Sequence, residues 1–128
     1  MIYLDTSVAL AQLLQEQRRP PAELWSETLV SSRLLEYELW NRLNSYQLQS
    51  SHGDIARQLL ARIALVELAN PVLVRALQPF PVAVRTLDAL HLASLDFLRQ
   101  RGLSVQLASY DDRLNQAARA LGYPLATV

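Results

Sequence analysis

The hydrophobic and polar positions of this chain form short apolar runs separated by longer segments of helical spacing. Leu, Val and Ala are frequent in the runs, and serine, proline or aspartate stands at most of their ends. In the first run, IYLD, the apolar residues lead directly to a carboxylate, Asp5, before a second apolar segment begins at Val8. Five runs are predicted to be strands: residues 2–5, 28–32, 64–68, 103–109 and 124–128.

The segments between the runs have the spacing of helices, most clearly over 33–49, where Leu35, Leu39 and Leu43 recur at every fourth position. We expect the hydroxyl of Thr6 or Ser7 to cap the first helix, because such oxygens accept hydrogen bonds from free N–H groups. The polar SSHGD segment is expected to interrupt the chain between two helices. Helices are predicted over residues 6–15, 22–27, 33–49, 54–64, 72–78, 86–101 and 111–122.

Strands that alternate with helices indicate parallel strands joined by right-handed crossovers. The chain is therefore predicted to form an α/β fold, a three-layer α/β/α sandwich around a parallel sheet of about five strands. Its 128 residues suit one domain spanning 1–128, and no internal repeat or linker divides it.

Composition narrows the possible functions. The net charge is zero, which argues against indiscriminate nucleic-acid binding through a large basic field. All 12 basic residues are arginine, and cysteine is absent, so neither disulfides nor thiolate metal sites are possible. The N-terminus lacks the features of a secretory signal, and no apolar stretch is long enough to span a membrane. We therefore expect a cytoplasmic protein without a membrane segment.

Acidic residues recur where the predicted strands turn into helices. Because ligand sites of parallel sheets lie at the carboxyl ends of the strands, these side chains are expected at one edge of the sheet. Each also has a simpler explanation: an aspartate near a helix N-terminus favours the helix dipole, and Glu38 could pair with Arg42 one turn later. The candidates are Asp5, Glu36, Glu38, Asp88, Asp111 and Asp112.

Asp5 is the hardest of these to explain by capping or surface pairing. It ends an apolar strand, and a buried carboxylate requires a partner such as an N–H group, an arginine or a metal. Carboxylates that converge from four segments would repel one another, and a divalent cation relieves that repulsion. Oxygen ligands suit Mg²⁺ or Mn²⁺ rather than zinc, and a metal of this kind can activate water against a phosphodiester.

The absence of lysine weakens three alternative functions. Haloacid-dehalogenase phosphatases require a lysine and a second aspartate at the place where this chain has Ser7. Response-regulator receivers also place a lysine near their acidic residues. P-loop NTPases need a lysine within a glycine-rich loop, and this chain has neither.

Four stretches, in order along the chain, resemble PIN-domain ribonucleases, specifically the VapC-like toxins of type II toxin–antitoxin systems. The ordered set covers essentially the whole chain, and the Asp-Ala-Leu-His-Leu-Ala core of the third stretch is the most specific. The resemblance implies a PIN-like sheet with strand order 3-2-1-4-5. The stretches are YLDTSVAL at 3–10, LLEYELWNRL at 34–43, RTLDALHLAS at 85–94 and SYDDRLNQAARALGY at 109–123.

The resemblance also implies a site in which three or four carboxylates hold Mg²⁺ or Mn²⁺. The matching positions are Asp5, Asp88 and Asp111, with either Glu38 or Glu36 as the glutamate. Those two glutamates lie about 200° apart around a helix, so only one can face the metal. We favour Glu38, and Asp112 is expected to be a solvated or capping residue. Supporting roles around the carboxylates fall to Thr6, Ser7, Asn41, His91 and Ser109. His91 is expected to pack beneath the site, and a role as general base is the alternative.

The expected activity is metal-dependent endonucleolytic hydrolysis of RNA, on tRNA or another structured RNA. The expected partners are a VapB-like antitoxin that blocks the site, the RNA substrate, and a second copy of the chain in a homodimer. Trp25, Trp40 and Tyr46 lie in the early helices and could serve either an interface or the core. The alternative is a PIN-like module that has lost catalysis and only binds RNA or protein.

Overall fold

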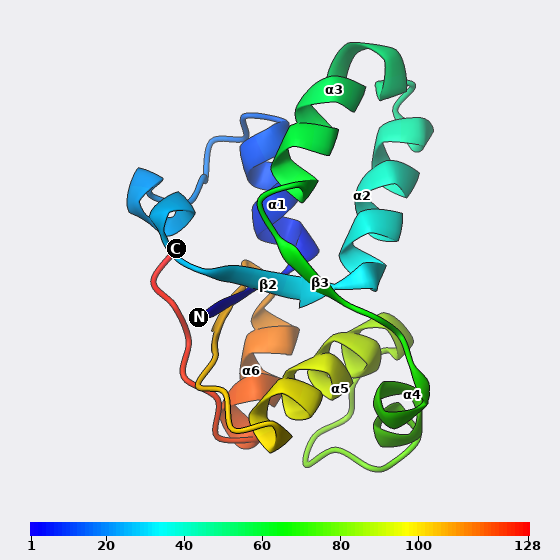
Figure 1. Ribbon diagram of the computed structural model, residues 1–128, viewed down its shortest axis with the longest axis vertical. Coiled ribbons are helices and arrows are strands. Elements are labelled where there is room, and N and C mark those ends of the chain that lie inside the picture. The colour runs from blue at the N-terminus through cyan, green and yellow to red at the C-terminus, as the bar shows by residue number, and fades with distance from the viewer.

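A parallel β-sheet lies at the centre of the computed structural model, which describes residues 1–128, and helices cover both of its faces (Figure 1). The strands are β1 (Ile2–Leu4), β2 (Leu29–Ser32), β3 (Ala64–Val66) and β4 (Gln106–Ala108). Their order is β3-β2-β1-β4, and every pairing is parallel. The strand that begins the chain therefore sits inside the sheet, with β2 and β4 on its two sides.

One helical layer contains α1 (Thr6–Leu13), α2 (Arg33–Ser45) and α3 (Gln49–Leu60). The opposite layer contains α5 (Thr86–Gln100) and α6 (Asp112–Ala120), with α4 (Asn70–Ala76) packed against α5 (Figure 1). A short 3-10 helix, η1 (Ala22–Ser26), leads into β2. The α/β sandwich predicted from the sequence is confirmed.

The alternation of β1 divides the core between the two layers. Ile2 and Leu4 point into the cluster formed with α1, α2 and α3, whereas Tyr3 points into the cluster formed with α5 and α6. Successive side chains of a strand face opposite sides, so a strand covered on both faces is apolar throughout. This double burial holds β1 firmly, and with it the residue that follows, Asp5.

The sheet has four strands, not the five expected. The predicted strand over 124–128 forms only one isolated bridge, between Leu107 and Leu125. Two hydrogen bonds make this contact, from the N–H of Leu107 to Pro124 and from the N–H of Ala126 to Leu107. Pro124 has no N–H to donate, which limits further pairing. The tail nevertheless lies beside β4, on the side where a fifth strand was expected.

The predicted helix break at 50–54 is wrong, because α3 begins at Gln49 and runs through this segment. The chain reverses earlier, at Gln47, whose φ of 56° lies in the left-handed region. Gly53 is part of the helix and faces the ring of Trp40, where an added Cβ would lie 3.4 Å from the ring edge. The small residue thus serves close packing between α2 and α3 rather than a turn.

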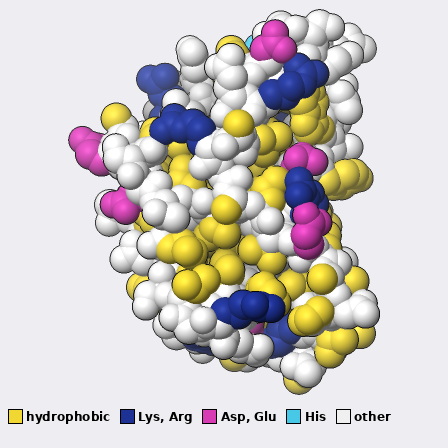
Figure 2. Space-filling model, in the orientation of Figure 1, with side chains coloured by type: hydrophobic (Ala, Val, Ile, Leu, Met, Phe, Trp, Pro, Cys, Tyr) yellow, Lys and Arg dark blue, Asp and Glu magenta, His cyan; other side chains and the backbone are white.

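On one face of the molecule, the charged side chains are scattered rather than gathered into one field (Figure 2). On the face shown in Figure 2, arginine and acidic side chains occur singly or in small groups with hydrophobic side chains between them. None of the helices has the length and apolar character required to cross a lipid bilayer.

Candidate active site

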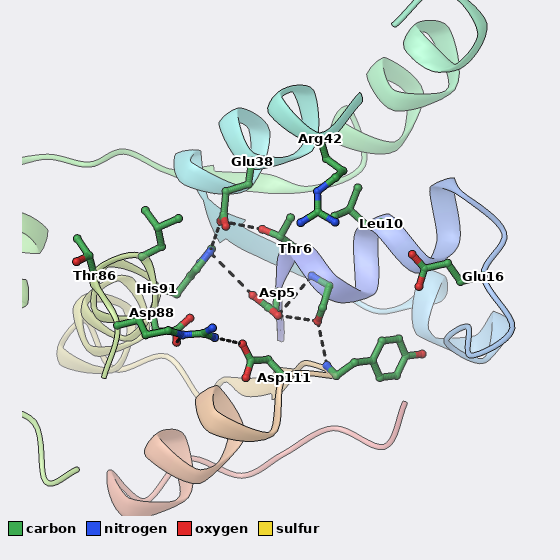
Figure 3. Close-up of a pocket in the computed structure, with 14 residues that line it drawn as sticks. Asp5, Thr6, Leu10, Glu16, Glu38, Arg42, Thr86, Asp88, His91 and Asp111 are labelled. Carbon is green, nitrogen blue, oxygen red and sulfur yellow. Dashed lines mark hydrogen bonds and ion pairs between the residues drawn. The ribbon is translucent and has the colours of Figure 1, made fainter. Parts of the chain in front are cut away.

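Five carboxylates line one pocket of about 690 Å³: Glu16, in the loop after α1, and four others from separate segments of the chain (Figure 3). Asp5 follows β1, Glu38 lies in α2 just after β2, Asp88 lies in the first turn of α5, and Asp111 follows β4. Three of these positions lie just beyond the carboxyl ends of the central strands, where parallel sheets place their sites. The pocket brings together the four acidic residues expected to act jointly.

Asp5 is held by hydroxyl and amide donors. Its Oδ2 accepts hydrogen bonds from the hydroxyls of Ser7, at 2.6 Å, and Ser109, at 2.8 Å. Asp5 is also the residue that caps α1, through a longer bond of 3.4 Å from the N–H of Ser7, so the expectation that Thr6 or Ser7 would be the cap is wrong. Because Asp5 caps the helix, the hydroxyls of Thr6 and Ser7 form other hydrogen bonds around the pocket.

Ser7 and Ser109 also connect the chain after β1 with the chain after β4. The hydroxyl of Ser7 accepts a hydrogen bond from the N–H of Tyr110, at 3.0 Å. The hydroxyl of Ser109 accepts one from the N–H of Asp111, at 2.9 Å. Both serines thus lie where the sequence placed them, beside Asp5, and they align the two loops that carry Asp5 and Asp111.

Glu38, and not Glu36, faces the pocket. Its Oε1 accepts a hydrogen bond from the hydroxyl of Thr6, at 2.9 Å, and lies 2.6 Å from Nε2 of His91. Glu36 is partly exposed on the other side of α2 and pairs with Arg33 at 3.3 Å. The helix phase of two positions separates the two glutamates, as expected.

Asn41, which was expected to support the carboxylates, lies outside the pocket, and so does Asp112, which was expected to be a solvated or capping residue. Asn41 is exposed on α2, and Arg42 lines the pocket in its place. Asp112 is exposed in the first turn of α6. Asp111 caps that helix through its Oδ1, which accepts hydrogen bonds from the N–H groups of Arg113 and Leu114. The capping explanation and the pocket position therefore both hold for Asp111.

A buried tyrosine that the sequence analysis missed completes the polar network beneath the pocket. The hydroxyl of Tyr3, fully buried, lies 2.7 Å from Nδ1 of His91, whose other nitrogen meets Glu38. Burial raises the pKa of Tyr3 far above its ordinary value, so the hydroxyl keeps its proton. In the sequence, a tyrosine within an apolar strand is indistinguishable from an ordinary core residue. Only the contact with His91 on α5 shows that Tyr3 supports the polar network.

His91 is nearly inaccessible to solvent, with 1% of its surface exposed. Burial lowers the pKa of His91, but the hydrogen bond with Glu38 and the nearby charges of Asp5, Glu38 and Asp88 raise it, and the raising effects prevail. Its Nε2 lies 3.9 Å from Oδ1 of Asp5. The ring therefore lies between two carboxylates and orients Glu38 (Figure 3).

Arg85, which the sequence analysis also missed, bridges the remaining two carboxylates. Its Nε donates to Oδ2 of Asp88 at 3.1 Å, and its Nη2 donates to Oδ2 of Asp111 at 2.6 Å. Burial raises the pKa of Asp88 above its ordinary value, although Arg85 acts in the opposite direction. Its position three residues before Asp88, at the start of α5, was the only sign available in the sequence.

The donor set suits a hard divalent cation, since every candidate ligand at the pocket is a carboxylate oxygen and no thiolate exists in the chain. No three acidic or histidine side chains lie close enough, in their present positions, to hold a metal ion. Arg85 forms ion pairs with Asp88 and Asp111, and His91 contacts Glu38. The residues fit a metal by chemistry, and binding one requires these side chains to rearrange.

Comparison with known proteins agrees with this geometry. The family model described as PIN domain matches residues 2–120. Ribonuclease VapC47 of Mycobacterium tuberculosis (strain CDC 1551 / Oshkosh) is 29% identical over 134 aligned positions, covering 99% of this chain and 96% of the relative. Ribonuclease VapC46 of Mycobacterium tuberculosis (strain ATCC 25618 / H37Rv) is 33% identical over 125, covering 94% and 92%. The resemblance found in the four sequence stretches is confirmed, and the chain belongs to the PIN domain family, where it is VapC-like over nearly its whole length.

Proposed function

We propose that this protein is an endoribonuclease dependent on Mg²⁺ or Mn²⁺ and that it acts as the toxin of a toxin–antitoxin pair. The observation that carries the proposal is the convergence of Asp5, Glu38, Asp88 and Asp111 on one pocket. Similarity over nearly the full length to two relatives named ribonucleases supports the choice of RNA as the substrate class.

Within this proposal, the four carboxylates would hold one or two divalent ions. A bound Mg²⁺ or Mn²⁺ supplies an activated water at neutral pH and offsets charge on the phosphate. Ser7 and Ser109 fix one oxygen of Asp5 and leave the other, Oδ1, without a hydrogen bond and available as a ligand. His91 orients Glu38 from below, so the side chain reaches the pocket in one rotamer.

The pocket also contains two guanidinium groups, those of Arg42 and Arg85. Arginine binds phosphate oxygens through two parallel N–H groups, so either could hold the RNA backbone near the carboxylates. The chain has no net charge, and this favours a substrate recognised by its local shape at the pocket over one drawn to a broad basic surface. A folded RNA such as tRNA is the substrate we propose.

The direct test incubates the purified protein with tRNA and other structured RNAs in Mg²⁺, in Mn²⁺ and in EDTA. We expect fragments of defined length with either metal and none with EDTA. Asp5→Asn should reduce the cleavage rate by at least about 100-fold, because it removes the charge of the most rigidly held ligand. Asp112→Asn is the matched control, since it removes an equal charge beside the pocket from a residue that does not line it.

Cleavage by Asp5→Asn at the wild-type rate would contradict the assignment of the site. RNA binding without cleavage in either metal would favour the alternative, an inactive PIN-like module that binds RNA or protein. Retention of full activity in EDTA would contradict the metal dependence alone.

We also propose a VapB-like antitoxin as partner, a homodimer as the assembly and the cytoplasm as the location. Of the three aromatic side chains considered for an interface, Trp25 and Trp40 pack against the core formed with α1, α2 and α3. Tyr46 is 55% exposed and remains available. Light scattering of the purified chain tests the dimer, and a monomer at micromolar concentration would contradict it. Co-purification with a small protein encoded beside it tests the antitoxin.

A further inference from the structure

Arg85 carries the positive charge that is bonded to two carboxylates of the pocket, Asp88 and Asp111. Its guanidinium group reaches Asp88 at 3.1 Å through Nε and Asp111 at 2.6 Å through Nη2, so one side chain joins two carboxylates from segments 23 positions apart in the sequence. The side chain of Arg85 is 57% exposed, whereas those of Asp88 and Asp111 are 13% and 26% exposed. The arginine therefore covers the two carboxylates from the solvent side.

The other arginine of the pocket behaves differently. Arg42 forms no salt bridge with any carboxylate, and its guanidinium lies 5.7 Å from the centre of the Tyr46 ring. It approaches from α2, on the side of Glu38 and Leu10 (Figure 3). The two arginines thus add equal charge to the same pocket, but only Arg85 is bonded to candidate metal ligands.

The carboxylates under Arg85 need a positive charge. One guanidinium group bonds both Asp88 and Asp111, and because their side chains are only 13% and 26% exposed, the two negative charges repel each other. A cation between Asp88 and Asp111 relieves this repulsion, and the guanidinium group supplies one. A divalent ion held by the same two carboxylates would compete for the same oxygens, because Arg85 bonds Oδ2 of each.

We propose that Arg85 is a displaceable internal cation, which holds Asp88 and Asp111 in the metal-free protein and is released when a divalent metal takes these carboxylates. The inference rests on the proposed metal site. Once released, the exposed guanidinium remains at the pocket and can donate to a phosphate of the bound RNA. Metal binding and substrate binding are thereby linked through one side chain, because the arginine becomes available for RNA only after it leaves the carboxylates.

The first test measures Mn²⁺ affinity without RNA, by electron paramagnetic resonance of the free ion, for the wild type, Arg85→Gln and Arg42→Gln. Removing the competitor should tighten Mn²⁺ binding of Arg85→Gln by about three- to tenfold. Arg42→Gln removes the same charge from the same pocket without freeing a carboxylate, so its affinity should change by less than about twofold. Circular dichroism confirms that the variants are folded.

The same variants should respond differently to RNA. With saturating Mg²⁺ and an RNA analogue that cannot be cleaved, Arg85→Gln should bind the RNA several-fold more weakly than the wild type does. Tighter metal binding together with weaker RNA binding is the signature of a cation that changes partners. A purely structural ion pair would show neither change in an otherwise folded protein.

Equal Mn²⁺ affinity of the wild type and Arg85→Gln, or equal tightening by Arg42→Gln, would overturn the displacement while leaving a metal-dependent nuclease intact. Absence of Mn²⁺ binding in both the wild type and Arg85→Gln would overturn the proposed metal site as well. Mn²⁺ binding by Arg85→Gln but not by the wild type would support the displacement. In nuclear magnetic resonance spectra, the Nε–H signal of Arg85 should lose its protection from solvent exchange on Mg²⁺ saturation, and an unchanged signal would overturn the release.

Discussion

Asp5 and Asp96 are two aspartates of almost equal burial, 7% and 6% exposed, with very different surroundings. Asp96, in α5, accepts hydrogen bonds from Nε of Arg75 at 2.7 Å, from Nη2 of Arg99 at 3.1 Å and from the hydroxyl of Tyr123. The hydrogen bonds to Asp5 come from two serine hydroxyls and one backbone N–H, and the nearest group that can carry a positive charge is His91, at 3.9 Å.

Compensation, more than burial, therefore distinguishes Asp96 from Asp5, the carboxylate that we propose as a metal ligand. Both arginines that neutralise Asp96 also stack on aromatic rings, Arg75 on Phe80 at 4.2 Å and Arg99 on Tyr123 at 4.1 Å. The negative charge of Asp96 is therefore fully compensated within the chain, and the cluster joins α4, α5 and the segment after α6. The negative charge of Asp5 is not neutralised by an arginine in this way, which is the state expected of a carboxylate that binds a metal ion.

The largest effect on stability is expected for Asp96→Asn. The change leaves the guanidinium groups of Arg75 and Arg99 without their shared carboxylate, and it should lower the free energy of unfolding by about 2–3 kcal/mol. Urea denaturation checks the value. Cleavage of RNA by the folded fraction should remain at the wild-type level, and a selective loss of cleavage would mean that the cluster contributes to the site.

A smaller loss is expected for Tyr3→Phe, which removes the hydroxyl that meets Nδ1 of His91 while keeping the ring in the core. The free energy of unfolding should fall by about 1 kcal/mol, the usual value of one buried hydrogen bond. RNA cleavage should fall modestly, because His91 is less firmly held against Glu38. Full activity would show that His91 needs no support from β1. Tyr37→Phe, at an exposed tyrosine, is the matched control.

In metal-free protein, Asp5→Asn is expected to increase the stability rather than to lower it. Relieving an uncompensated charge should raise the free energy of unfolding by up to about 1 kcal/mol, as is common when active-site charges are removed. Adding Mn²⁺ should stabilise the wild type and have little effect on this variant. Thermal denaturation with and without EDTA provides both measurements. A loss of stability as large as that of Asp96→Asn would erase the distinction between the two aspartates.

The smallest expected effect is a change with pH in the stability that His91 contributes. The pKa of folded His91 is raised above the ordinary 6.5, so its protonated form stabilises the fold. That contribution is fully present below about pH 6.5 and is lost as the pH rises through the raised pKa. His91→Gln should therefore cost more stability at pH 6 than at pH 9 in EDTA. The arginine partners of Asp96 stay charged, so the cost of Asp96→Asn should be equal at both values, and a parallel change in both variants would contradict the assignment.

Much of the fold and the site followed from local patterns. The apolar runs identified β1 to β4, and strands alternating with helices implied a parallel sheet whose carboxyl edge collects Asp5, Glu38, Asp88 and Asp111. Helix phase was sufficient to separate Glu38 from Glu36. The break predicted at 50–54 failed because a glycine usually marks a turn, and only the ring of Trp40 from the neighbouring helix explains its place inside α3.

The sequence by itself determined which residue types stand at the ends of the strands, since strand and helix periods are local properties of the chain. Only the tertiary structure decided what these residues meet. Arg85 reaches Asp111 across 26 positions, Tyr3 reaches His91 across 88, and Asp96 finds Tyr123 across 27. Such contacts depend on how the helical layers pack against the sheet. Whether a carboxylate is neutralised or left open to a cation is therefore a property of the packed chain.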